Sequence, residues 1–251
     1  MPTIEENRSQ WTTYDWSQGG HEWSQTWGGT DYLWWGSLYP RIRSFIPVEN
    51  GLEIAPGYGR VTQYLLHFCK RLTLVDLTSR CIEACKERFS DHGHLTYHVN
   101  DGKSLDAVAD GSVDFVLSFD SLVHADADVL CGYVEELSRK LSPHGVGFIH
   151  HSNLGAFKDP ETGKLPFDNL HWRSDTMSAQ LFREYCQRFS LQCIAQELIN
   201  WGGNVLHDCF SVFTRPGAPF SRECIIRENP GFMGEANALG AIASLYRPAE
   251  E

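Results

Sequence analysis

Short apolar runs alternate with amphipathic segments through residues 50–150. Runs of about four to eight apolar residues between turn residues are typical of buried strands, and apolar residues three or four positions apart are typical of helices. The runs predict strands at Gly51–Ala55, Leu72–Asp76, Thr96–Asn100, Val113–Phe119 and Gly145–His150, followed by Leu191–Ile199 and Cys209–Thr214. The periodic segments predict helices at Asp31–Ile46, Arg60–Cys69, Ser79–Phe89, Ser104–Ala109, Ala127–Leu141 and Asn237–Leu245, with one more after a Ser178 cap. This order predicts an α/β fold with a doubly wound, mostly parallel, seven-stranded sheet.

The segments outside this region are an aromatic N-terminal arm and a C-terminal extension. Six of the eight tryptophans fall within residues 1–36, interleaved with glycines and without clean periodicity. We expect residues 1–48 either to pack on the domain surface or to close over a site as a lid. Residues 49–215 form the expected central domain, with a polar insertion at 152–176 that is too long for a plain connector. Residues 216–251 either pack on the body or contact a second copy in a homodimer.

Composition narrows the classes of partner. The 251 residues carry a formal net charge of -11 and no basic run, which argues against nucleic acid because phosphate contacts need clustered Lys and Arg. No apolar stretch approaches the roughly 18 residues of a membrane span, and the polar, acidic N-terminus is unlike a secretory signal. The eight cysteines include no C-x-x-C pair. We therefore expect reduced thiols and a cytoplasmic protein, with zinc or disulfides as the alternative.

A glycine turn follows the first predicted strand. Gly57 and Gly59 lie between the apolar strand residues Leu52 and Ile54 and a helical pattern that begins near Arg60. Such a turn exposes backbone N–H groups at the carboxyl edge of a parallel sheet, where nucleotide-like ligands bind. Asp76 ends the second strand at about the 20-residue offset expected for a carboxylate that binds ribose hydroxyls. The third predicted strand has an acid, Asp101, at its tip.

The order of these motifs resembles the class I S-adenosylmethionine-dependent methyltransferases from about Gly51 to Thr214. The match comprises Glu53-Ile54-Ala55-Pro56-Gly57-Tyr58-Gly59, Asp76, Asp101-Gly102, Ser118–His124 and Leu141–Gly145, with Ala55 where the family usually has its first glycine. The resemblance implies S-adenosylmethionine as cofactor. It implies that Glu53 orders the loop and that Ala55, Gly57 and Gly59 approach the methionine part. It further implies cofactor contacts for Asp76, Leu77, Asp101, Gly102 and Asp120. A hydride-transfer enzyme is the rival, but Thr62 replaces the third glycine of its fingerprint.

Substrates in this fold class meet the cofactor at the tips of the fourth and fifth strands. Asp120 follows the fourth strand, and His150 and His151 end the fifth. Methyl transfer to a hydroxyl requires a proton acceptor, and histidine suits this role near neutral pH. We therefore expect His151 or His150 to act as general base, with Asp120 orienting it or sharing the role. Structural, hydrogen-bonded histidines are the alternative.

A divalent metal is a further possibility. Some sugar O-methyltransferases resemble this layout and hold magnesium with acids at these strand tips; the matching positions here are Asp120, His150 and His151. Because magnesium prefers oxygen ligands, the two histidines would suit manganese or zinc better.

The expected acceptor is a small molecule or an oligosaccharide. Candidate substrate contacts are Trp27, Trp34, His124, His171 and Trp172, because aromatic faces with polar neighbours suit sugars or other aromatics. The segments Trp27–Trp35 and Phe148–Asn153 look similar to bacterial sugar O-methyltransferases, in particular those of mycobacterial methylmannose polysaccharides. A phenolic acceptor is the second hypothesis, and a non-catalytic adenosyl-binding scaffold is the third.

Overall fold

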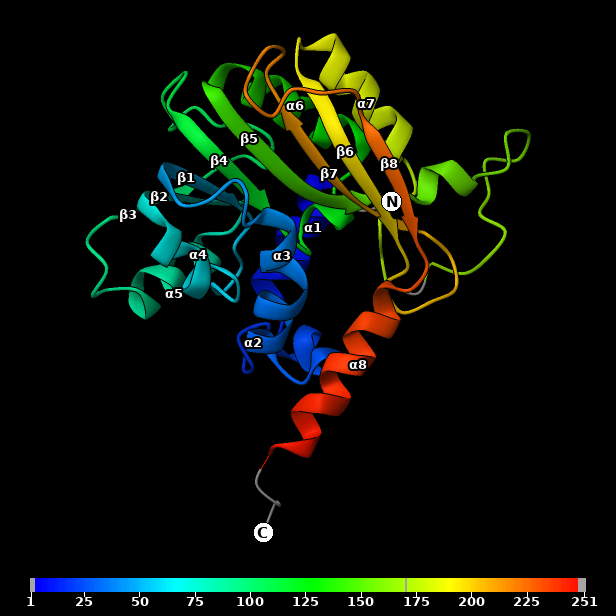
Figure 1. Cartoon of the computed structure of the whole chain (residues 1–251), viewed down its shortest axis with the longest axis horizontal. Helices are drawn as coiled ribbons and strands as arrows, with labels where there is room; N and C mark the ends of the chain where they lie inside the picture. Colours follow the sequence, from blue (N-terminus) through cyan, green and yellow to red (C-terminus); the bar gives the residue numbers. More distant parts are fainter. Residues whose placement is uncertain (1–2, 170, 248–251) are drawn as a thin grey trace.

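The computed structural model describes residues 3–169 and 171–247, in which eight strands form one sheet with the order β3-β2-β1-β4-β5-β7-β6-β8 (Figure 1). The strands are β1 Val48–Ile54, β2 Cys69–Asp76, β3 Leu95–Val99, β4 Val113–Ser118, β5 Leu141–Ser152, β6 Gln192–Ile199, β7 Asp208–Thr214 and β8 Ile225–Asn229. The first five pair in parallel, and β7 runs antiparallel between β5 and β6. The predicted α/β class and all seven predicted strands are confirmed, and β8 adds an edge strand parallel to β6.

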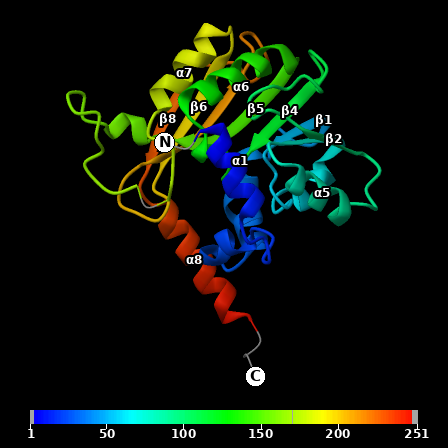
Figure 2. The same ribbon diagram turned by 180° about the vertical axis from the view of Figure 1, so that it is seen from behind.

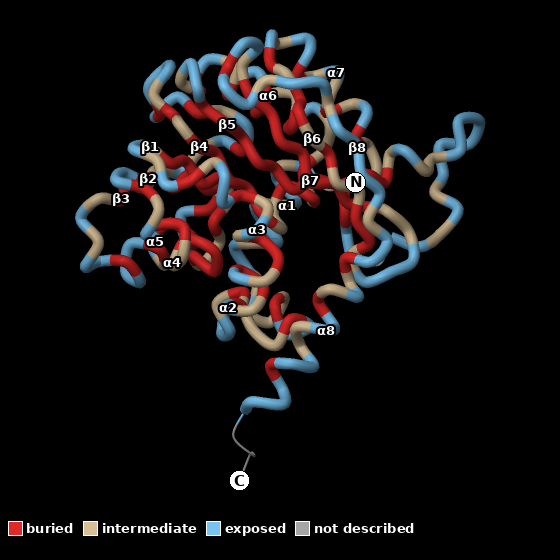
Figure 3. Tube along the Cα trace, in the orientation of Figure 1, coloured by how far each residue is buried: buried red, intermediate tan, exposed pale blue. Residues whose placement is uncertain are grey.

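Helices cover both faces of this sheet. They are α1 Ile4–Thr13, α2 Thr30–Leu33, α3 Tyr39–Ile42, α4 Thr62–Leu65, α5 Ser79–Arg88, α6 Ala127–Lys140, α7 Ala179–Arg188 and α8 Phe232–Leu245. Figure 2 shows α6 and α7 across one face, where their apolar residues pack on the sheet. The other face packs against α3, α4, α5 and α8. Buried residues therefore form one cluster on each face of the sheet, and Figure 3 shows that buried positions are concentrated along its central strands.

Four details of the predicted helices differ from the structure. Residues 104–109 form no helix and contain only a short turn at 106–107. The expected helix Arg60–Cys69 is α4 followed by a 3₁₀ turn at Leu66–Phe68. At Pro40 the chain continues from a π-helical segment, Trp34–Leu38, into α3. Proline is tolerated there because the N–H group that it lacks would have no intrahelical partner in the first turn of a helix. The extension helix α8 begins five residues earlier than the pattern indicated.

The N-terminal arm is more ordered than its sequence pattern suggests. A capping box at Thr3 and Glu6 starts α1, and a 3₁₀ helix η1, His21–Trp27, follows. The extension returns to this arm, because Gly240 of α8 approaches the carbonyl of Thr26 so closely that a Cβ atom would lie 2.3 Å from the oxygen. In Figure 1, α8 projects from the sheet beside α2. The extension therefore supplies both an edge strand and a support for the arm.

Two general expectations can be compared with the fold. None of the helices described for residues 3–169 and 171–247 has the length and apolar character needed to cross a bilayer. All eight cysteines lie in these ranges and are free thiols.

Candidate active site

The glycine turn after β1 adopts left-handed backbone angles. Ala55 has φ 58°, Gly57 58° and Gly59 78°, a region that side chains disfavour. A Cβ atom on Gly57 would lie 3.0 Å from the Trp16 ring, and one on Gly59 would lie 2.5 Å from the Phe89 ring. Both glycines are therefore required by close packing as well as by backbone conformation.

Two buried carboxyl groups flank this turn. Asp76 accepts hydrogen bonds from the Gly57 N–H at 3.2 Å and the Thr78 N–H at 2.8 Å, while Glu53 accepts one from the Thr62 hydroxyl at 2.7 Å. Burial raises the pKa of Asp76 to about 6 and the pKa of Glu53 to about 7. Glu53 thus connects the end of β1 to the start of α4, and Asp76 holds the turn from the end of β2.

A cavity of about 590 Å³ extends from this turn to the tip of β4. Among the predicted site residues, its lining includes Glu53, Ala55, Gly57, Asp76, Leu77, Gly102, Asp120, His124, His171 and Trp172. The arm adds Trp11, Tyr14, Trp16, Glu22 and Trp23. The cavity therefore joins the expected cofactor residues to an aromatic end in which arm residues form part of the wall.

The arm is fixed over the turn by aromatic stacking and by one arginine. The Trp16 and Tyr58 rings stack with centroids 4.5 Å apart at 4°. The Arg60 guanidinium lies over the Trp23 ring, 5.6 Å from its centroid, and donates to the Ser24 hydroxyl at 2.8 Å. These contacts place the arm against the cavity.

Asp120 at the tip of β4 is held on two sides. Its carboxylate pairs with Arg60 at 2.7 Å, and its backbone N–H donates to Nδ1 of His150 at 3.1 Å. The residue has φ 58°, which is uncommon for a residue with a side chain. The ion pair and the backbone hydrogen bond together hold this strained tip in place.

His124 lies at the aromatic end of the cavity, in the 3₁₀ turn η4, Leu122–His124. Its ring centroid is 5.3 Å from that of Trp11 and 5.5 Å from that of Trp172. Its Nδ1 lies 2.9 Å from the carbonyl oxygen of Trp172, so Nδ1 carries the proton and donates it. Burial lowers the pKa of His124 to about 4, and the ring is therefore neutral near pH 7.

His150 lies beneath this end of the cavity rather than in its lining. Its ring is fully buried and stacks on Trp201, with centroids 5.3 Å apart. Because Nδ1 accepts from the Asp120 N–H, the proton resides on Nε2, which lies 3.2 Å from the Asp208 carboxylate without good hydrogen-bond alignment. His150 thus positions Asp120, and the structure does not support a direct catalytic role for it.

His151 points to the opposite face of the sheet. Strand β5 continues to Ser152, two residues beyond its predicted end, and successive side chains of a strand alternate in direction. The His151 ring is fully buried, stacks on Phe182 at 4.6 Å and contacts the Ser211 hydroxyl through Nε2 at 2.8 Å. The expectation that His151 acts as general base is therefore not met.

The predicted metal ligands are not assembled either. The Asp120 carboxylate is paired with Arg60, His150 uses Nδ1 for a backbone N–H, and His151 faces away. Within the described part of the chain, no group of three His, Cys, Asp or Glu side chains is arranged to hold a metal ion. The donor set thus fails to fit magnesium, manganese or zinc.

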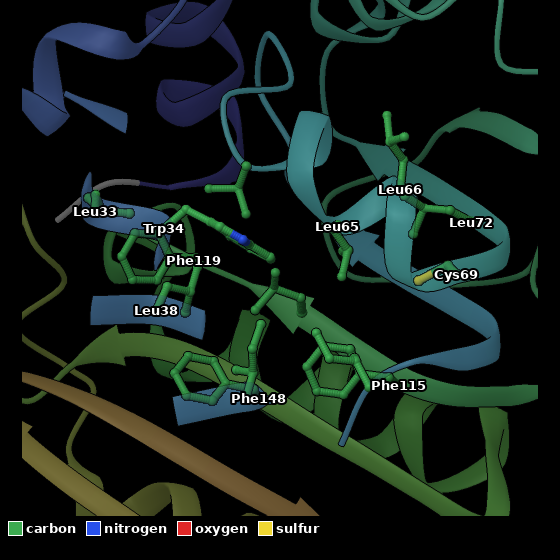
Figure 4. Packing of buried hydrophobic residues seen from close by; sticks show 14 of the residues in the cluster. Leu33, Trp34, Leu38, Leu65, Leu66, Cys69, Leu72, Phe115, Phe119 and Phe148 are labelled. Carbon is green, nitrogen blue, oxygen red and sulfur yellow. The ribbon is translucent and has the colours of Figure 1, made fainter. Parts of the chain in front are cut away.

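Further predicted site residues lie outside the cavity lining. Trp27 and Trp34 are both core residues, 1% and 0% exposed; Trp27 donates to the Ser37 hydroxyl, and Figure 4 shows Trp34 among packed apolar side chains. Gly59 packs under Phe89. Asp101 is exposed and accepts from the N–H groups of Lys103 and Ser104 in a local turn. Four expected ligand contacts are therefore replaced by structural roles.

The structure also adds cavity residues that sequence reasoning missed. Examples are Trp11, Tyr14, Glu22, Trp23, Arg60 and Trp201. The Thr3-x-x-Glu6 signature could have revealed α1, and with it the face that carries Trp11. No local pattern indicates that Arg60 bonds Ser24 from 36 residues earlier in the chain.

Part of the chain is similar to a known protein family. Residues 52–149 match the family model of a methyltransferase domain. This stretch contains the glycine turn, Asp76 and Asp120, and it extends from β1 through most of β5. Residues 52–149 are therefore similar to a methyltransferase domain.

Individual relatives match shorter parts of the chain. Nodulation protein S of Sinorhizobium fredii (strain NBRC 101917 / NGR234) is 34% identical over 55 residues, which cover 22% of this chain and 26% of the relative. Nodulation protein S of Rhizobium tropici is 26% identical over 120 residues, 45% of each chain. This chain thus spans less than half the length of these curated relatives.

Solved structures show the same fold. An S-adenosylmethionine-dependent methyltransferase of Leishmania major has a TM-score of 0.60 at 11% identity, covering 84% of this chain and 82% of its own. One from Clostridium acetobutylicum ATCC 824 has a TM-score of 0.54 at 14% identity, covering 82% and 94% respectively. The shared architecture extends well beyond residues 52–149.

The residues around the glycine turn fit S-adenosylmethionine, the cofactor that the sequence resemblance implies. Asp76 at the end of β2 can accept from ribose hydroxyls, and the left-handed turn at Gly57 brings backbone close to the cavity. A Cβ atom on Gly102 would lie 3.0 Å from Ile4 and 3.2 Å from Leu77. A residue with a side chain would therefore crowd this part of the cavity wall. These residues would hold the nucleoside, and the bound cofactor would supply an electrophilic methyl group.

Proposed function

We propose that this protein is an S-adenosylmethionine-dependent methyltransferase that transfers the methyl group to a hydroxyl of a sugar or oligosaccharide, with mannosides among the candidates. The observation that carries the proposal is the composition of the cavity end beyond the glycine turn. There the indoles of Trp11 and Trp172 flank His124, with Asp120 and Arg60 nearby. Aromatic faces bind the C–H faces of a pyranose, and the polar groups between them bind its hydroxyls.

The charges at this end also favour a neutral acceptor. Arg60 is paired with Asp120, and Arg173 is paired with the buried Asp208 at 2.7 Å. Neither guanidinium is left to balance a charged group on a ligand. The lining also includes Glu22, which keeps one carboxylate oxygen without a hydrogen bond. Carbohydrate hydroxyls, which donate and accept, suit such a wall.

A phenolic acceptor is the alternative, since the same indoles can stack on an aromatic ring. Both hypotheses place the acceptor against this aromatic wall, and truncating the wall tests that placement. Trp172→Ala should raise the KM for the acceptor and leave the Kd of S-adenosylmethionine unchanged. Trp27→Phe is the control, because Trp27 lies in the core and should affect stability without changing the acceptor KM.

The deciding experiment is methyl transfer from labelled S-adenosylmethionine to a panel of free and partly methylated oligosaccharides and phenols, with and without EDTA. We expect transfer to a saccharide that EDTA leaves unchanged, because the proposal contains no metal. Transfer confined to phenols would replace the sugar hypothesis. A requirement for magnesium or manganese would show that Asp120 and the strand-tip histidines rearrange to bind an ion.

We further propose that two copies associate and that the reaction takes place in a reducing compartment such as the cytoplasm. Edge strand β8 exposes Ile225 and Ile226, and the eight free thiols fit reducing conditions. Sedimentation of the purified protein at several concentrations would test the first point, and localisation of a tagged protein would test the second.

A further inference from the structure

We propose that His124 is the general base that accepts the proton of the attacking hydroxyl, with Nε2 as the accepting atom. This inference rests on the proposed O-methyl transfer and replaces the histidines expected from the sequence. It starts from three features of the ring: its tautomer, its place in the cavity and its neighbours.

The tautomer is fixed by the backbone. Nδ1 donates to the carbonyl oxygen of Trp172 at 2.9 Å, which leaves the lone pair of a neutral imidazole on Nε2. No group within residues 3–169 and 171–247 forms a hydrogen bond with Nε2, and this atom is not sealed from solvent as Nε2 of His150 is. His124 therefore presents a free acceptor.

The ring is also held in one orientation. It lies between the indoles of Trp11 and Trp172, and the His124 carbonyl accepts from the Asn7 side chain at 3.0 Å. Asn7 in turn accepts from the Trp11 indole N–H at 3.2 Å. Helix α1 of the arm thus positions the same residue that the turn after β4 supplies.

Other titratable groups of this cavity end are less suited to the role. The Asp120 carboxylate is bound by Arg60. Tyr14 donates its hydroxyl proton to Glu22 at 2.8 Å, and burial raises its pKa to about 12. Glu22 keeps one carboxylate oxygen without a hydrogen bond, so it is a rival that the experiment must separate from His124.

The step balances without a further reactant. As the acceptor oxygen attacks the methyl carbon, Nε2 takes the hydroxyl proton. The new O–C bond forms while the C–S bond breaks, and the electron pair of the C–S bond returns to sulfur. The products are the methyl ether, the neutral thioether and an imidazolium whose Nδ1–H still donates to Trp172. The charged groups that face this ring are Asp120 and Asp208, which favour the imidazolium, and Arg173, which opposes it.

The test compares His124→Asn with wild type on whichever hydroxyl acceptor the panel identifies. Asparagine keeps a donor for the Trp172 carbonyl and removes Nε2. We expect kcat to fall roughly 10²–10⁴-fold, with the Kd of S-adenosylmethionine unchanged. We also expect log kcat to rise with pH between 6 and 9, where wild type is flat, because hydroxide then removes the proton. His144→Asn, a substitution of an exposed residue near the start of β5, is the matched control.

Three outcomes would overturn the proposal. One is a His124→Asn enzyme with near-normal kcat and a flat pH profile, and another is the hydroxide-dependent profile in Glu22→Gln instead. The third is independent of activity and of folding of the variant: nitrogen NMR of the wild-type imidazole at pH 7 should show Nδ1–H, and an Nε2–H tautomer would contradict the assignment. Failure of wild type to methylate any sugar would instead overturn the proposed acceptor.

Discussion

Arg60 connects Asp120, at the tip of β4, to Ser24 of the N-terminal arm through one guanidinium group. Its terminal nitrogens lie 2.7 Å from the Asp120 carboxylate and 2.8 Å from the Ser24 hydroxyl, and both ion-pair side chains are nearly buried. The same guanidinium lies between the Trp23 and Phe119 rings. One side chain therefore holds the arm to the strand edge where the reaction is proposed to occur.

Replacing this side chain should loosen the arm. In Arg60→Met, the apolar stem remains but the hydrogen bonds to Ser24 and Asp120 are lost. Because a hydrogen bond to a charged group contributes about 1.5–3 kcal/mol, amide exchange in residues 16–27 should accelerate at least roughly tenfold. Hydrogen-exchange mass spectrometry measures this. Lys86→Met, which breaks an exposed pair with Glu83, is the control, and equal exchange in both variants would disprove the linkage.

Asp76 should make cofactor binding dependent on pH. Its pKa of about 6 in the free protein reflects burial, while ribose hydroxyls would donate to the ionised form. Binding should therefore release a proton below pH 6, and the affinity for S-adenosylmethionine should fall up to about tenfold per pH unit there. Asp76→Asn should bind roughly 10–100-fold more weakly and lose this pH dependence.

Calorimetric titration between pH 5 and 8 checks that expectation. Because Glu53 lies near the same turn and has a pKa raised to about 7, the series is repeated in Glu53→Gln. A fall in affinity that persists in Asp76→Asn but disappears in Glu53→Gln would assign the dependence to Glu53 instead.

Ala55 has a φ of 58°, which is unfavourable for an L-residue. Left-handed geometry costs such a residue about 1–2 kcal/mol. Replacing alanine by glycine lowers the free energy of unfolding by about 0.4–1 kcal/mol, because the unfolded chain becomes more flexible. Ala55→Gly should therefore stabilise the fold by about 0.5–1 kcal/mol. Urea denaturation measures the difference. Ala84→Gly inside α5 should destabilise by about 1 kcal/mol, and a loss of stability in both variants would refute the strain argument.

Local sequence pattern predicted the sheet because each strand is an apolar run between turn residues. It also identified the residues at strand ends, such as Asp76 and Asp120, that line the cavity. Strand β8 was missed because Ile225-Ile226-Arg227-Glu228-Asn229 is short, exposed and without alternation. This strand forms by pairing with β6, about 30 residues earlier in the chain. The sequence of residues 225–229 alone does not indicate that pairing.

The errors at the site have a similar origin. Whether His150 and His151 reach the cavity depends on where β5 stops, and an extension of two residues decides it. The local sequence does not distinguish the tryptophans of the arm from one another. In the structure, however, Trp11 and Trp23 line the cavity, whereas Trp27 and Trp34 lie in the core. That division follows from how α1, η1 and α8 pack together, which a single sequence does not encode locally.

Asp208 at the start of β7 is the buried charge beneath the cavity. Its oxygens lie 2.7 and 2.9 Å from Nε of Arg173, and the Nε2–H of His150 faces it at 3.2 Å. Burial alone would raise the pKa of Asp208, but the Arg173 guanidinium and His150 hold it well below its usual range. A depressed carboxyl pKa stabilises the fold above the unfolded value of about 4, and this stabilisation is lost as pH falls below it.

Asp208→Asn should therefore lower the free energy of unfolding by about 3–5 kcal/mol at pH 7, because it leaves the Arg173 charge buried without its partner. The difference from wild type should narrow as pH falls from 5 to 3, since only wild type has this carboxylate to protonate on unfolding. Urea denaturation across that range measures both effects. Asp110→Asn, which removes an exposed partner of Lys140, should change stability little at any pH. A constant difference between wild type and Asp208→Asn down to pH 3 would show that the depressed pKa of Asp208 does not contribute to stability, and that the loss at pH 7 comes from packing.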